Sequence, residues 1–201
     1  MRKIKTKSDE IKKQKRNQLI IGIILVFVML GSVFGVIVNS FGQDSGNQRV
    51  VYNGILFNEQ NGFWIVEKDN FNLVFKNNPE QVENINAELK PIENYYGKPL
   101  YIYSENSEAE LEIYRNLFYQ NNIVQRMQPA CLNKNNSLNL SLDCGSELPI
   151  KSCENNFLII VEGESNRIIQ KDSCVLIESP TENLTKATDE FLFNLFGIRQ
   201  G

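Results

Sequence analysis

The hydrophobic and polar positions divide the chain into one continuous apolar segment and a longer part with short apolar runs. The apolar segment extends from Leu19 to Val38 and contains no charged residue. As an α-helix it would be about 30 Å long, which matches the hydrocarbon core of a bilayer. No later run is comparable, so the pattern predicts a single transmembrane helix in residues 19–38.

Three strand-like runs follow a polar linker in residues 39–49. They are Val50 to Phe57, Phe63 to Glu67 and Phe71 to Phe75. Asn61-Gly62 and Asp69-Asn70 lie between them, and such pairs favour tight turns. The runs therefore predict an antiparallel meander at the start of the outer part of the chain.

Helix-start signals occur at Asn78, Ser107 and Ser179, each of which precedes Glu or Gln by three positions. At Asn78 and Ser179 the next residue is proline, which is favoured at the first helical position. Gly197 is expected to end the last helix. We expect the following residues at helical spacing to face the core: Val82, Ile85 and Leu89; Leu111, Tyr114, Leu117 and Phe118; Leu184, Ala187, Phe191 and Leu195.

The remaining apolar runs predict a second set of strands. They are Leu100 to Tyr103, Ile123 to Leu132, Phe157 to Glu162, Arg167 to Gln170 and Cys174 to Glu178. A strand, a helix and a strand in succession favour a parallel pair joined by a right-handed crossover. The fold class expected for residues 50–201 is thus mixed α/β, with a mixed sheet, an N-terminal antiparallel meander and about three helices.

Charge adds an orientation to this picture. Residues 1–18 have a formal charge of +6, and the rest of the chain has −9. By the positive-inside rule, residues 1–18 are a cytoplasmic tail, residues 19–38 a signal anchor in the cell membrane, and residues 50–201 an extracytoplasmic domain. The acidic outer part argues against nucleic-acid binding.

Two further interpretations concern the apolar segment. A cleaved signal peptide is the alternative to an anchor, but the run is longer than usual and no A-x-A-like site follows it. Gly31 and Gly35 form a G-x-x-x-G pair, which can bring two membrane helices into close contact. A homodimer through this pair is therefore a possibility to test.

The four cysteines, Cys131, Cys144, Cys153 and Cys174, all lie in the part predicted to be outside. An even number of cysteines in an oxidising compartment favours two disulfides, although three pairings exist. We favour Cys131–Cys144, which closes a polar loop, and Cys153–Cys174, which links neighbouring strands. The alternative is a zinc site of four thiolates, but the gaps do not match the usual C-x2–4-C pairs.

Three sequons place candidate N-glycosylation sites at Asn135, Asn139 and Asn183. The first two lie in the presumed disulfide loop. Asn183 lies near a helix start and has a simpler structural interpretation.

Candidate catalytic chemistry is sparse. The chain has no histidine, which excludes His-based triads, shuttles and metal sites, and it has none of the common phosphate-binding loops. Glu162, Glu164 and Asp172 could bind a hard cation, but a solvated turn is the simpler interpretation. Lys186 and Asp189 are read as a surface ion pair. No metal or cofactor is expected. Tyr95, Tyr96, Tyr101 and Tyr103 could stack on sugars, but packing explains them as well.

The stretch from Leu148 to Ile198 resembles the C-terminal part of single-pass membrane proteins of small-genome archaea. The resemblance is carried by Leu148 to Cys153, Ser173 to Val175, Lys186 to Asp189 and Leu195 to Ile198. It implies a membrane-anchored architecture and no activity. An archaeal source would fit both this resemblance and glycosylation outside the cell, and a bacterial source is the alternative.

These observations lead to one functional expectation and two alternatives. The expected protein is a non-catalytic binding or structural module of the cell envelope, which contacts the lipid bilayer and another envelope protein or a glycan. The alternatives are an accessory subunit of a membrane complex and a histidine-free hydrolase that uses paired carboxylates.

Overall fold

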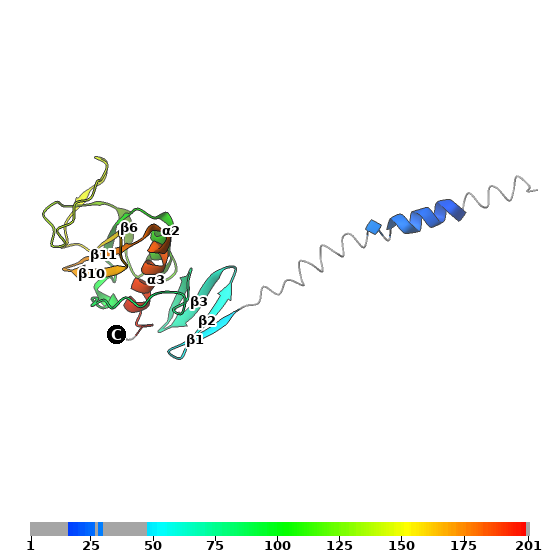
Figure 1. Cartoon of the computed structure of the whole chain (residues 1–201), viewed down its shortest axis with the longest axis horizontal. Coiled ribbons are helices and arrows are strands. Elements are labelled where there is room, and N and C mark those ends of the chain that lie inside the picture. Colours follow the sequence, from blue (N-terminus) through cyan, green and yellow to red (C-terminus); the bar gives the residue numbers. More distant parts are fainter. Residues whose placement is uncertain (1–15, 27, 30–47, 200–201) are drawn as a thin grey trace, which may run out of the picture. The chain divides into compact units, whose positions relative to one another are not determined.

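The computed structural model describes residues 16–26, 28–29 and 48–199 (Figure 1). It divides into two units, which fall within residues 1–46 and 47–201. In the first unit, residues 16–26 and 28–29 are helical and their apolar side chains are exposed, with 64% exposure at Leu19. Within these described ranges, no helix has both the length and the apolar character needed to cross a membrane. Gly31 and Gly35 lie outside the described residues.

The second unit begins with the predicted antiparallel meander. Its strands follow one another in space as in sequence: β1 (Arg49–Tyr52), β2 (Ile55–Gln60), β3 (Phe63–Lys68) and β4 (Phe71–Phe75). Asn61 and Gly62 have φ values of 54° and 77°, which are typical of a tight hairpin turn. The run expected as one strand from Val50 to Phe57 is in fact β1 and β2, because Asn53 and Gly54 form another such turn.

A five-stranded mixed sheet forms the centre of the second unit, in the order β10-β11-β9-β5-β6. The strands are β5 (Pro99–Ser104), β6 (Arg126–Pro129), β9 (Phe157–Glu162), β10 (Arg167–Lys171) and β11 (Cys174–Ser179). All neighbours are parallel except β10 and β11. The predicted parallel pair around a crossover helix is confirmed by β5 and β6. Two further strands, β7 (Cys131–Leu132) and β8 (Ile150–Lys151), form a small separate sheet.

Two of the three helices expected in this unit are present. They are α2 (Ser107–Ile113), which continues as the π-helical turn η2 (Tyr114–Tyr119), and α3 (Leu184–Leu195), which follows the short turn η3 (Thr181–Asn183). Another short turn, η1 (Ile92–Asn94), precedes β5. Gly197 has a φ of 62° and ends α3 as expected.

The predicted helix from Asn78 is wrong, although its capping box forms. The Asn78 side chain accepts hydrogen bonds from the Glu80 and Gln81 N–H groups, and the Gln81 side chain accepts one from the Asn78 N–H. Beyond that turn the chain is extended and its burial alternates with period two from Ile85 to Leu89. Side chains from elsewhere take the backbone groups that a helix would use: Glu190 accepts from the Ile85 N–H, and Arg199 donates to the Val82 carbonyl.

At the other two helix starts, the capping residue differs from the predicted one. Asn106 caps α2, because its side chain accepts a hydrogen bond from the Ala109 N–H at 2.9 Å. The Ser179 hydroxyl donates to the Asn166 side chain and does not cap α3. On α2 the buried residues are Ala109, Glu112 and Ile113. Of the predicted face, Leu117 is fully buried as expected, whereas Leu111 is 53% exposed, so the buried face is rotated over α2.

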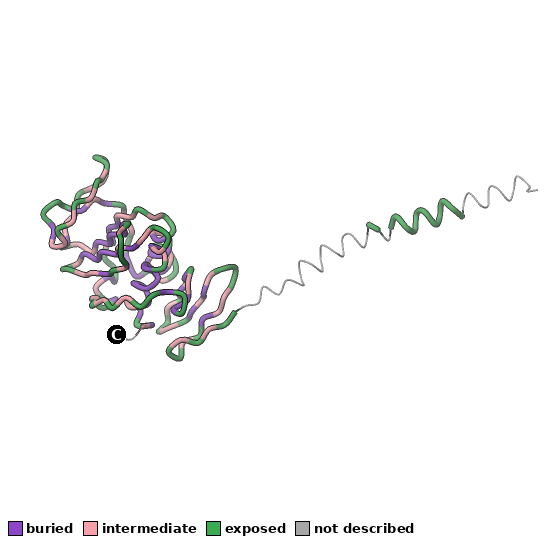
Figure 2. Tube along the Cα trace, in the orientation of Figure 1, coloured by how far each residue is buried: buried purple, intermediate pink, exposed green. Residues whose placement is uncertain are grey.

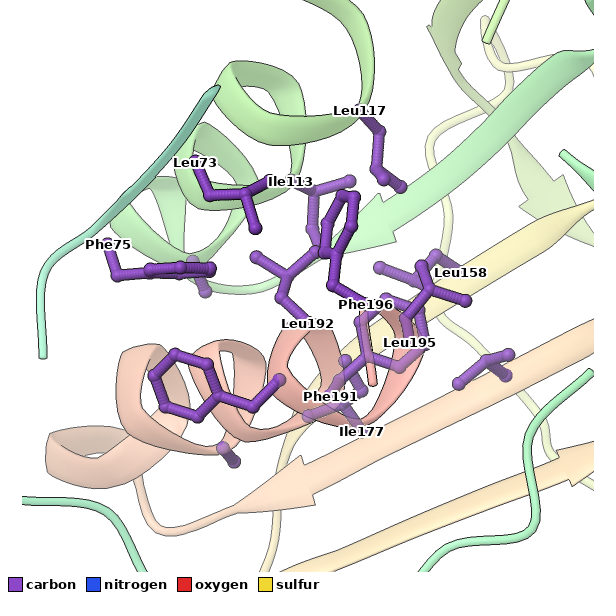
Figure 3. Close-up of a cluster of buried hydrophobic side chains, with 14 of the residues drawn as sticks. Leu73, Phe75, Ile113, Leu117, Leu158, Ile177, Phe191, Leu192, Leu195 and Phe196 are labelled. Atoms are coloured by element: carbon purple, nitrogen blue, oxygen red, sulfur yellow. The ribbon is translucent and has the colours of Figure 1, made fainter. Parts of the chain in front are cut away.

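The core lies on both faces of the five-stranded sheet. Alternate residues of β5, β9 and β11 point to opposite sides, as the pleat requires. On one side, α2 and α3 pack against the sheet, and the meander packs on these helices through pairs such as Phe75 with Phe193. Figure 2 shows buried chain concentrated there. Figure 3 shows the side chains of α3, α2 and β4 that meet in this layer, among them Phe75, Ile113 and Leu192. On the other side, a smaller cluster contains Phe157, Ile159 and the cysteine loop.

Candidate functional site

The loop between β7 and β8, residues 133–149, is closed at its base by a short sheet and a disulfide. Cys131 donates a backbone hydrogen bond to the Pro149 carbonyl, and Asn133 donates one to the Lys151 carbonyl. Cys131 is bonded to Cys144, with their Cα atoms 5.9 Å apart. The pairing favoured from sequence is confirmed, and it fixes both ends of a segment that has no regular structure of its own.

The second disulfide lies on the same face of the sheet. Cys153, just before β9, is bonded to Cys174 at the start of β11. Both residues are buried in the smaller core cluster. Because all four cysteines are paired, the zinc alternative has no thiolates to use.

One buried side chain organises the interior of the loop. The Asn136 amide donates to the carbonyls of Asn133 and Leu140, each at 2.7 Å. Its oxygen accepts hydrogen bonds from the Leu138 and Leu140 N–H groups, each at 3.1 Å. A single asparagine thus replaces the backbone pairing that a helix or a sheet would provide.

The loop has an apolar underside and a polar outer surface. Leu138, Leu140 and Leu142 pack against the sheet, and the Tyr103 hydroxyl donates to the Asp143 carbonyl. The alternate residues Asn139 and Ser141 are exposed. Figure 1 shows this segment, in yellow-green, extending outward from the sheet. The loop is therefore held in a defined position while it presents amide and hydroxyl groups to solvent.

The sequons are placed differently with respect to solvent. Asn135 and Asn139 are exposed on the loop, and Asn183 is partly buried in η3. A glycan has room at the first two positions, and their use stays a prediction.

An open groove runs beside the base of the loop. It has a volume of about 530 Å³, and it is lined by the loop and by the turns next to the Cys153–Cys174 bond. Its walls carry Asn135, Ser137, Ser152, Glu154 and Asp172. Amide and hydroxyl groups with two carboxylates and the Lys90 ammonium suit a polar ligand better than an apolar one.

The second candidate is a pair of buried acids between α2 and α3, which the sequence analysis did not identify. Asp189 has no exposed surface and Glu112 has 2%. Oε2 of Glu112 and Oδ1 of Asp189 have no partner among the described groups, and the carboxyls lie close enough to hydrogen-bond when one is protonated. The expected surface ion pair of Lys186 and Asp189 is therefore wrong, because Asp189 faces the interior and accepts hydrogen bonds from Asn77.

Burial decides the electrostatics of this pair. Desolvation raises the pKa of Asp189 well above its usual range, and the nearby Glu112 carboxylate raises it further. Desolvation also raises the pKa of Glu112, although the Arg115 guanidinium, 2.7 Å from Oε1, opposes this effect. The pair is thus expected to share one proton and to titrate as a unit.

Access to the acid pair is restricted. A cavity of about 140 Å³ lies above Glu112 and is lined by Phe63, Lys76 and Arg115. The Arg115 guanidinium lies 4.6 Å from the centroid of the Phe63 ring and partly covers the site. Glycosidases need two carboxyls about 5 Å or more apart with a sugar between them, whereas these two are buried and interact with each other. The geometry suits a structural proton better than hydrolysis.

A third buried carboxylate is fully paired. Glu190 accepts from Nε of Arg199 at 2.7 Å, and Arg199 also donates to the Tyr52 hydroxyl and to the Val82 carbonyl. Burial raises the pKa of Glu190, and Arg199 opposes this effect. This cluster links the meander, the extended segment after Asn78 and α3, so its role is structural.

The remaining sequence candidates do not assemble into a site. Within the described ranges, no three acidic, cysteine or histidine residues are placed to hold a metal, and this includes Glu162, Glu164 and Asp172. Tyr95 belongs to the larger core cluster and Tyr101 to the smaller one, so the tyrosines do not form one platform.

Comparisons of the chain with protein families, with curated proteins and with solved structures found no match. The assignment of a function therefore depends on the geometry described above.

Proposed function

We propose that the chain is a membrane-anchored binding module of the cell envelope, without catalytic activity. Its loop at residues 133–149 would contact another envelope protein or a glycan. Residues 1–18 would lie in the cytoplasm, residues 19–38 would form the anchor, and the domain would be displayed outside.

The observation that carries this proposal is the construction of the loop. Long segments without regular structure in compact domains are usually either functional or disordered. This one is crosslinked by Cys131–Cys144 and organised by the buried Asn136, and its leucines are packed on the sheet. A loop that is fixed from below and polar on top has the properties of a preorganised recognition surface.

The compartment is supported by separate features. Two disulfides are favoured by an oxidising space outside the cytoplasm. The described helix before the domain exposes its apolar side chains, which agrees with a segment that meets lipid. The basic residues before it and the acidic domain after it fit the proposed orientation.

The test compares two pairs of substitutions in the full chain, purified in mild detergent from cells that produce it. Lys134→Ala with Glu147→Ala removes two exposed charges from the loop and leaves all three sequons intact. Lys186→Ala with Glu182→Ala removes the same charges from exposed positions at α3, across the sheet. Proteins that co-purify with the wild type and with each double variant are quantified by mass spectrometry. The same three proteins are also applied to a glycan array.

We expect a stoichiometric partner, or a glycan signal, that the loop pair weakens at least about tenfold and the α3 pair does not. A partner that both pairs retain equally would contradict the assignment of the loop as the contact surface. The absence of any partner in both experiments would contradict the binding function itself.

A further inference from the structure

The two edges of the four-stranded meander differ in how their backbone groups are satisfied. In an antiparallel ladder, alternate residues of an edge strand point their N–H and C=O groups away from the sheet. On β4 these residues are Asn72 and Val74, as the register with β3 requires. On β1 they are Arg49 and Val51, because the Glu59 N–H bonds to the Gln48 carbonyl and the ladder alternates from there.

The β4 edge is closed by two asparagine side chains from the end of the α2–η2 helix. Asn116 accepts from the Val74 N–H at 2.9 Å and donates to the Val74 carbonyl at 2.8 Å. Asn121 makes the same pair of bonds with Asn72. Asn116 lies in η2 and Asn121 in the turn that follows it, where the Asn121 amide also donates to the Asn116 carbonyl at 2.8 Å. The two amides are thereby held opposite alternate residues of the strand.

The β1 edge has no such cover among the described residues. No described group hydrogen-bonds to the outward N–H and C=O groups of Arg49 and Val51. The Val51 side chain is 66% exposed, and Leu56, which lies opposite it on β2, is 45% exposed. An edge strand with free backbone groups and apolar neighbours is a template for another strand.

We propose that the β1 edge pairs with the β1 edge of a second copy of this chain, antiparallel about a two-fold axis at Val50. This register places Arg49 of each copy opposite Val51 of the other. Both residues point outward, so each such pair can exchange two backbone hydrogen bonds. The four-stranded meander would become a continuous eight-stranded sheet across two molecules.

A second copy is favoured over a foreign strand for two reasons. The register that uses all the outward groups of β1 is self-complementary, as a two-fold interface requires. The predicted anchor and its linker end directly at β1, so two copies held in one membrane would meet at a high effective concentration. This inference does not depend on the cysteine loop, which lies on the far side of the five-stranded sheet.

The test uses charge at position 51, measured by sedimentation equilibrium of the full chain in mild detergent. Val51→Lys would place a cation opposite Arg49 of the other copy and raise the dimer dissociation constant about tenfold. Val51→Glu would place an anion there and lower it. In a single copy residue 51 is exposed and faces Leu56, so neither change is expected to alter folding.

Two controls locate the interface. Leu56→Lys puts a charge on the same exposed face but one strand away, and it is expected to change the dissociation constant less than Val51→Lys. Val51→Pro removes an N–H that points outward, and it should abolish the dimer with little change in the thermal unfolding of the domain. Circular dichroism of each variant verifies that it is folded.

A chain that is monomeric at every concentration would overturn the proposal. So would a dimer that is indifferent to the charge at residue 51. A dimer lost only in the variant with Gly31→Leu and Gly35→Leu would assign the contact to the predicted span and also overturn it. Recovery of the dimer when Arg49→Glu is combined with Val51→Lys would confirm the register.

Discussion

The two faces of the five-stranded sheet are stabilised by different means. On the helix side, α2, α3 and the meander bury the large aliphatic and aromatic cluster that includes Phe57, Phe75 and Phe193. On the loop side, the cluster is small, and two disulfides and one asparagine replace most of the packing. The helix side therefore has a shape set by side-chain volume, whereas the loop side has a shape set by crosslinks and hydrogen bonds. The outer residues of the loop are free to carry specificity, because few of them hold the fold.

The largest effect is expected from Phe193→Ala. Phe193 is fully buried, and its ring lies 4.7 Å from that of Phe75 and 6.2 Å from that of Phe57. Its removal leaves a cavity between α3 and the meander and should lower the free energy of unfolding by about 3–5 kcal/mol. Urea unfolding measures this loss. Leu140→Ala, partly buried on the loop side, is the matched variant and should cost clearly less.

Removal of the loop disulfide should have the next largest effect. Cys131→Ala with Cys144→Ala releases the crosslink, and the chain-entropy description gives a loss of about 3 kcal/mol for a loop of this size. Chemical denaturation under non-reducing conditions reports the change. If the loss is below about 0.5 kcal/mol, Asn136 and the leucines hold the loop without the crosslink. That result would contradict the claim that disulfides set the shape of the loop side.

Asn136→Ala tests the hydrogen-bonded interior of the loop. The change leaves the Leu138 and Leu140 N–H groups and the Asn133 carbonyl without their partner, which should cost about 1–3 kcal/mol, mostly as local opening. Amide hydrogen exchange should show faster exchange at Leu138 and Leu140 and unchanged protection on α3. The neighbouring exposed Asn135 gives the control, since Asn135→Ala should leave both unchanged.

The parts of the fold with one dominant local signal could be predicted from the sequence. The hairpin at Asn61-Gly62, the apolar strands β9 and β11 and the C-terminal helix follow from turn chemistry and spacing. The segment after Asn78 could not, because its apolar residues fit a helix at 82, 85 and 89 and a strand at 85, 87 and 89 equally well. Tertiary contacts decide between them, since Arg199 and Glu190 bind its backbone from distant parts of the sequence.

The candidate site shows the same limit. The cysteine pairing could be argued from loop size, but the role of Asn136 could not, since it is one of many asparagines in the chain. The acid pair was missed for a different reason. Ala109, Ile113 and Leu117 define a buried stripe along α2 and η2 that also contains Glu112, yet Leu111 and Tyr114 suggested a competing face. A polar residue inside an apolar stripe was the available signal.

Asp189→Asn tests whether the buried acids on the helix side lower the free energy of unfolding at neutral pH. The pKa values of Asp189 and Glu112 are raised in the folded domain, so the pair keeps a proton that the unfolded chain has released above about pH 4. The free energy of unfolding of the wild type should therefore fall as the pH rises above about 4, by at most about 1.4 kcal/mol per pH unit for one proton.

In Asp189→Asn the side chain at this position cannot ionise. Its oxygen can still accept the Asn77 hydrogen bonds, and its amide hydrogens can donate to the Glu112 carboxylate in place of the shared proton. The variant should be about 1 kcal/mol more stable than the wild type at pH 7, with a smaller difference near pH 4, as measured by urea unfolding across this range. Glu112→Gln also removes the shared proton, but it leaves Arg115 without its carboxylate, so its pH dependence should flatten without a gain at pH 7. A wild-type curve that does not fall above pH 4, or an Asp189→Asn variant that is less stable throughout, would show that both acids are ionised and stabilised by groups other than a shared proton.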